Sequence, residues 1–289
     1  MKKSLLLLSG LGFVLLLSGC TPSNMGAFIM EKAAETRIGQ SLTDDLEDGL
    51  HVILCGAGGP MPDPKRSGPC VAVIAGETLV TIDAGSGGSR NLAAMQFPLG
   101  EVSAQFLTHF HSDHIDGLGE MAMMRWVNTA NTSPLPVYGP QGVENVVNGF
   151  NLSYGADAVY RNAHHTDMVA PLSGKGMIAH AFTPPADGAL LTVFEKDGLK
   201  VSAFTVDHEP VHPAVGYRFD YKGRSVVISG DTAKSANLEQ FSQGVDLLVH
   251  EALNREMVGI MEAAAKKNNV KTLEKIFFDI TDYHASPVE

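Results

Sequence analysis

The segment from Leu107 to Glu120 constrains this chain more than any other, because it holds three histidines and two aspartates within eight positions. The apolar run before it predicts a β-strand. Side chains at i and i+2 of an extended segment project to the same side, so His109 and His111 can bind one ion together. Asp113 and His114 follow where the chain turns, and they suit a second ion. Imidazole and carboxylate groups are the ligands of zinc sites that keep a position open for water. The motif therefore predicts a metal site at a strand end.

The first nineteen residues have the pattern of a bacterial secretory signal. Lys2 and Lys3 precede an apolar run that leads through small residues to Cys20. A cysteine directly after Leu-Ser-Gly resembles a lipobox. This resemblance implies cleavage before Cys20, acylation of its thiol, and a mature chain that is lipid-anchored in the cell envelope, facing the periplasm or the exterior. The alternative is an ordinary signal peptide with an incidental cysteine.

Three parts are expected along the chain. Residues 1–19 form the signal peptide, residues 20–50 a tether and N-terminal helix, and residues 51–289 one domain. Strands in series with helices between them, and polar residues at the strand ends, predict an α/β fold with two sheets and helices outside. Residues 151–190 show no period and are predicted to be loops over the site, with His164, His165 and His180 at the surface.

The net charge indicates which binding partners the protein can have, and the cysteine content bears on its cellular compartment. Loss of residues 1–19 removes two lysines and takes the formal charge from −11 to −13. Nucleic-acid binding depends on phosphate neutralisation by Lys and Arg, so this charge makes nucleic acid an unlikely partner. Cys55 and Cys70 end two neighbouring predicted strands. A disulfide between them is permitted outside the cytoplasm, and two buried free thiols are an equal alternative.

Further histidines and acidic residues occur at later strand ends. They are His208, Asp231 in Gly-Asp-Thr, His250-Glu251, and His284 near the C-terminus. Together with the motif at 109–114, they resemble the metallo-β-lactamase superfamily, and within it the branch of ribonuclease Z and exported arylsulfatase-like hydrolases. The resemblance runs from about Leu54 to the end of the chain. It implies a four-layer αβ/βα sandwich with the site at one edge.

The same resemblance implies two metal ions. His109, His111 and His208 would hold the first, Asp113, His114 and His284 the second, and Asp231 would bridge them. His212 is the weaker alternative to His208. The expected cofactors are two Zn²⁺, although sites made of His and Asp also accept Mn²⁺ and Fe²⁺.

The resemblance also implies catalytic roles. Hydrolysis would use a water whose pKa the metals lower. His250 would donate a proton to the leaving group, Glu251 would orient His250, and Asp113 would accept a proton from the water. Asp83 would orient a histidine ligand rather than touch metal, or would serve as a strand-end turn residue.

Two departures from the family pattern shape the expected function. Gly216 and Gly230 are only 14 positions apart, which leaves no room for the basic arm with which ribonuclease Z proteins clamp tRNA. The chain also stops five residues after His284, so we expect its C-terminal end to be missing. We therefore expect a membrane-anchored dinuclear zinc hydrolase that cleaves a small-molecule ester, an aryl sulfate or a phosphodiester, by metal-bound hydroxide.

Three alternatives remain open. The first is a ribonuclease Z-like phosphodiesterase or endoribonuclease. A β-lactamase or lactonase is less favoured, and a non-catalytic metal-binding lipoprotein is the third. The expected partners are the small-molecule ester and the membrane that holds the anchor, and a homodimer is left open.

Overall fold

The computed structural model describes residues 22–288, and the chain divides after Asp44 into two parts. The first part contains helix α1 (Pro22–Arg37). The predicted signal peptide and Cys20 lie outside the described residues, so the lipid anchor stays a prediction. Between residues 22 and 288, no helix combines the length and apolar character that a membrane span requires.

Six strands form the first sheet of the second part, in the order β1 to β6. β1, β2 and β3 pair antiparallel, and β3, β4, β5 and β6 pair parallel. Every residue of β2 and β3 is buried, as expected for strands covered on both faces. The bounds are β1 Leu50–Gly56, β2 Cys70–Ala75, β3 Thr78–Ile82, β4 Val102–Phe106, β5 Leu135–Pro140 and β6 Met177–Phe182.

Five strands form the second sheet, in the order β11-β10-β9-β8-β7. Its hairpins turn at Asp197-Gly198 and Lys222-Gly223, where both residues have positive φ, as the tight turns of twisted hairpins require. The bounds are β7 Leu191–Lys196, β8 Leu199–Thr205, β9 Val215–Tyr221, β10 Arg224–Ile228 and β11 Leu247–Val249.

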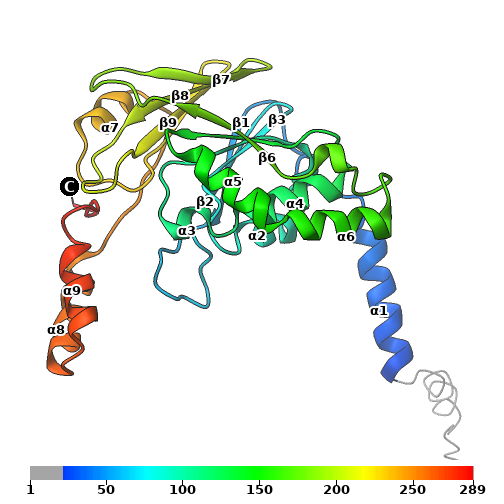
Figure 1. Cartoon of the computed structure of the whole chain (residues 1–289), viewed down its shortest axis with the longest axis horizontal. Coiled ribbons are helices and arrows are strands. Elements are labelled where there is room, and N and C mark those ends of the chain that lie inside the picture. The colour runs from blue at the N-terminus through cyan, green and yellow to red at the C-terminus, as the bar shows by residue number, and fades with distance from the viewer. Residues whose placement is uncertain (1–21, 289) are drawn as a thin grey trace, which may run out of the picture. The chain divides into compact units, whose positions relative to one another are not determined.

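The two sheets pack face to face around an aromatic core. The ring of Phe106 lies 5.3 Å from that of Tyr217 and 6.1 Å from that of Phe219, centroid to centroid. Helices cover the outer face of the first sheet, and α7 covers the second through Leu238 and Phe241 (Figure 1). This confirms the predicted four-layer sandwich. The helices of this region are α2 Gly88–Ala94, α3 Ser112–Ile115, α4 Leu118–Asn128, α5 Val143–Ser153, α6 Gly155–His165 and α7 Ala236–Phe241, with short 3-10 turns at Leu99–Glu101 and Leu172–Gly174.

The prediction of loops over residues 151–190 is wrong. The segment contains the end of α5, all of α6 and strand β6. Ala158 is the one buried residue of α6, and the polar residues and histidines of this helix gave the segment a composition that resembles a loop. His164 and His165 are exposed at its end, and His180 is exposed on β6, as predicted.

A disulfide and a C-terminal helical hairpin complete the fold. Cys55 and Cys70 form a disulfide with a Cα–Cα distance of 5.0 Å, which decides between the two alternatives left open by the sequence. Near the C-terminus, α8 (Arg255–Lys267) and α9 (Lys271–Asp279) form a hairpin that packs through Val258 and Phe277. This hairpin joins the Glu251 segment to the loop that carries His284 (Figure 1).

Candidate metal centre

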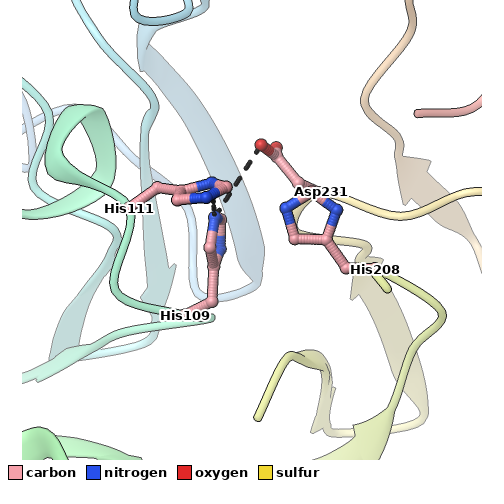
Figure 2. Close-up of side chains that lie close together, drawn as sticks. All are labelled: His109, His111, His208 and Asp231. Carbon is pink, nitrogen blue, oxygen red and sulfur yellow. Dashed lines mark hydrogen bonds and ion pairs between the residues drawn. The ribbon is translucent and has the colours of Figure 1, made fainter. Parts of the chain in front are cut away.

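Strand ends from both sheets bring four predicted ligands together. His109 and His111 follow β4, His208 follows β8, and Asp231 follows β10. One ligand atom from each residue lies within 4.8 Å of all the others (Figure 2). These residues are separated by up to 122 positions in the sequence, so the two packed sheets create the site.

Hydrogen bonds between the sheets fix the segment that carries His109. The Tyr217 hydroxyl on β9 donates to the Leu107 carbonyl at 2.7 Å, and the Val215 N–H donates to the Thr108 carbonyl at 3.0 Å. Gly230 packs against Thr108 so closely that a Cβ would lie 2.8 Å from the Thr108 Cβ, and its φ is +63°. Only glycine fits there without strain, and this turn places Asp231.

The donor atoms fit a zinc ion. The Nδ1 of His208 donates to the Tyr283 carbonyl at 3.0 Å, which leaves Nε2 with its lone pair free. That Nε2 is buried and has no hydrogen-bond partner among residues 22–288. A buried polar atom without a partner costs about 1–3 kcal/mol. Three imidazoles and a carboxylate are ligands that zinc accepts, and a bound cation would remove this cost.

The pKa values of the cluster residues also favour binding of a metal cation. Burial lowers the pKa of His109 to about 2 and lowers the pKa of His208. Burial alone would raise the pKa of Asp231, but the neighbouring His114, His109 and His284 outweigh it and hold that pKa below its usual value. At neutral pH His109 and His208 are thus unprotonated and Asp231 is ionised, the states in which these groups bind metal.

Asp83 holds His114 beside the cluster. The Nδ1 of His114 donates to Asp83 at 2.8 Å, and its Nε2 lies 3.2 Å from Asp231. Burial lowers the pKa of His114, but Asp83 and Asp231 outweigh this effect and raise it well above its usual value. Asp83 therefore has the geometry of the orienting residue predicted from the sequence, and its φ of 53° also makes it a strand-end turn residue.

The other two predicted ligands of a second ion lie next to this group. Asp113 is buried in α3, its Oδ2 is 3.7 Å from the Nε2 of His114, and burial raises its pKa. The ring of His284 lies 5.4 Å from that of His208, centroid to centroid. Neither residue belongs to the four-residue group whose ligand atoms lie within 4.8 Å.

In the described part of the chain, no hydrogen bond joins the Glu251 carboxylate to the ring of His250, the contact that the predicted orienting role requires. The Glu251 carboxylate instead accepts hydrogen bonds from His284 Nδ1 at 3.0 Å and from two backbone N–H groups, those of Ala285 and Thr232. His250 is exposed and donates only to the carbonyl of Glu251. Neighbouring side chains at a strand end point to opposite sides, so one of this pair faces the site and the other faces away.

The structure also separates His208 from its alternative. His208 is fully buried in the cluster, whereas His212 is exposed and paired with Glu209.

Sequence reasoning missed Thr108, whose hydroxyl donates to both Asp83 oxygens and receives a hydrogen bond from His109 Nδ1. Its place directly before His109, at the end of a strand, was the available signal.

A family model described as the metallo-beta-lactamase superfamily matches residues 63–267. The chain belongs to this superfamily. Members of the superfamily bind metal ions, typically zinc, and the match establishes a metal-dependent hydrolase fold without identifying the metal.

Similar proteins within the superfamily are named ribonuclease Z, a more specific description than the superfamily. A ribonuclease Z from Mycobacterium bovis is 36% identical over 240 residues, which span 82% of this chain and 78% of that protein. A ribonuclease Z from Mycobacterium marinum is 35% identical over 242 residues, 83% of this chain and 80% of that protein. The crystal structure of human tRNase Z, short form, has a TM-score of 0.58 at 22% identity, covering 82% of this chain and 84% of that one, and shows the shared fold alone.

These relatives correct the partner prediction. The prediction that the partner is a small-molecule ester and that nucleic acid is unlikely is wrong, because the relatives are named for action on RNA. The names also give no support to an aryl sulfate as substrate. The prediction failed because it used the formal net charge of −13 expected after loss of residues 1–19, which averages over the surface and does not report the potential beside a cation site.

Proposed function

We propose that this protein is a ribonuclease Z-like phosphodiesterase that hydrolyses a phosphodiester bond in RNA. The observation that carries the proposal is the convergence of His109, His111, His208 and Asp231 at one sheet edge. The similarity to two proteins named ribonuclease Z, over about four fifths of each, supports RNA as the substrate class.

In this proposal the cluster holds zinc, with Asp113, His114 and His284 completing a second ion's site. Bound zinc supplies Lewis acidity at a phosphoryl oxygen and makes water a stronger acid. The chain's own residues contribute position and protonation state. Asp83 fixes the ring of His114, Glu251 fixes the ring of His284, and the buried Oδ2 of Asp113 is the atom that would receive a proton from the attacking water.

RNA contacts must come from outside the β9–β10 connection. The structure joins these strands by Lys222 and Gly223 alone, so no arm extends there.

We also propose that the chain is exported and anchored through Cys20. The Cys55–Cys70 disulfide supports this location, because disulfides persist in oxidising compartments. Labelling with a radioactive fatty acid, absent in Cys20→Ala, would test the anchor.

The activity is tested with a 5′-labelled RNA that carries a 3′ extension. Zinc-loaded protein is expected to cleave it, and His208→Ala to lose at least about 100-fold in rate, since it removes a ligand. His212→Ala is the matched control, because His212 precedes the same strand but is exposed, and it should cleave normally. Hydrolysis of aryl sulfate by the wild type without RNA cleavage would overturn the proposal.

A further inference from the structure

A cavity of about 190 Å³ lies among α4, α5, α6 and the start of β6. None of the histidines or acidic residues of the metal centre lines it, so it is a separate site. Its walls are mostly apolar and include Ala122, Met123, Trp126, Phe150, Tyr154 and Met177.

The polar groups inside these walls are satisfied. The Trp126 indole N–H donates to the Pro171 carbonyl at 2.7 Å. The Asn151 amide donates to the Met177 carbonyl and accepts from the Met177 N–H, both at 2.9 Å. The interior therefore offers apolar and aromatic surface rather than hydrogen bonds. A cavity of about 150 Å³ with such walls holds a benzene-sized molecule.

A lysine without a partner is among the residues that line the cavity. Lys175 lines it, is exposed, and makes no hydrogen bond or ion pair with any residue from 22 to 288. Asp157 also lines the cavity, and its carboxylate already accepts a hydrogen bond from Arg161 at 2.7 Å. The Tyr154 hydroxyl is a second group without a hydrogen bond to the described residues.

We propose that this cavity binds a small cyclic carboxylate. Its ring would lie against Trp126, Met123 and Phe150, and its carboxylate would pair with the Lys175 ammonium. The apolar walls select the ring, and the unpaired cation selects the acid over the corresponding alcohol. Asp157 does not cancel this preference, because Arg161 neutralises it.

Trp126 makes the test direct. It is the single tryptophan of the chain and lies in the cavity wall, so its fluorescence reports on the site. Titration with benzoate is expected to change this fluorescence and to saturate, and benzyl alcohol is expected to bind more weakly. Lys175→Gln should weaken benzoate about tenfold and leave benzyl alcohol unchanged, since a charge-assisted contact is lost. The control is Lys200→Gln, an exposed lysine on β8 outside the cavity lining.

A second variant blocks the space without touching the charge. Gly155 lines the cavity, and a Cβ there meets nothing within 4 Å, so the side chain of Gly155→Leu begins in open space beside the cavity. It should abolish the fluorescence response. Gly149→Leu, at an equally open helical glycine outside the lining, should bind benzoate like the wild type. Unchanged benzoate titrations in both Lys175→Gln and Gly155→Leu would overturn the proposal. So would a wild-type dimer in sedimentation that shows no response to benzoate, because a subunit contact would then fill the cavity.

Discussion

Asp83 accepts a hydrogen bond from the Nδ1 of His114 at 2.8 Å, and this contact turns the other ring nitrogen toward Asp231. The same carboxylate accepts from the N–H of Thr108 at 2.9 Å and from its hydroxyl. One residue at the end of β3 thus connects the histidine beside the cluster to the segment that carries His109. A carboxylate behind a metal-binding histidine fixes the ring and its tautomer.

Replacing Asp83 by Asn should therefore weaken zinc binding. Asn has nearly the same size and also tolerates a positive φ, which is 53° here, so the backbone turn is kept. The zinc affinity is expected to fall about 10–100-fold. Competition with a chromophoric chelator measures it. Asp116→Asn, at an exposed aspartate of the same motif, is the control. Equal zinc affinity in Asp83→Asn and wild type would contradict an orienting role for Asp83.

The sequence was sufficient to predict the cluster itself. His109 and His111 are close because they are two positions apart in an extended segment, which is a local property. His208 and Asp231 were placed by resemblance to a family and by their positions after predicted strands. The sheet order that brings these strand ends together depends on long-range pairing, which a single sequence does not reveal.

The partner of Glu251 shows where such reasoning fails. The resemblance to the superfamily implied that Glu251 orients the adjacent His250. The structure pairs Glu251 with His284 instead, because the α8–α9 hairpin returns the chain to the same point 33 residues later. Helix α6 was missed for a different reason. Its polar, histidine-containing composition was interpreted as that of a loop, so the cavity beside it was not predicted either.

Thr108→Val should destabilise the metal-free protein. Valine keeps the shape of threonine but leaves Asp83 and the Nδ1 of His109 without the hydroxyl that contacts both. Loss of a buried hydrogen-bond partner costs about 1–3 kcal/mol of unfolding free energy. Urea unfolding in the presence of a chelator measures it. Thr192→Val, at an exposed position on β7, should leave the unfolding free energy unchanged. A loss no larger in Thr108→Val than in this control would exclude the proposed role of the hydroxyl.

Reduction of the disulfide should lower stability without altering the site residues. Cys55 and Cys70 are 15 positions apart, and closing a loop of this length stabilises a protein by about 3 kcal/mol. Wild type in reductant and the Cys55→Ala/Cys70→Ala double variant should show the same loss in urea unfolding. The double variant should not respond to reductant, which provides the internal control. If reductant left the unfolding of the wild type unchanged, the disulfide would not be formed in solution.

His284→Ala should separate the two metal sites. Glu251 holds the Nδ1 of His284, so its other ring nitrogen is available to a second ion, whereas His109, His111, His208 and Asp231 form the compact group without it. The wild type is expected to bind two zinc ions per chain after dialysis and His284→Ala one, measured by elemental analysis. His180→Ala, which removes an exposed histidine on β6, should keep two. Two ions in His284→Ala would show that His284 holds no ion and that Glu251 positions the C-terminal loop instead. One ion in the wild type would contradict the second metal site.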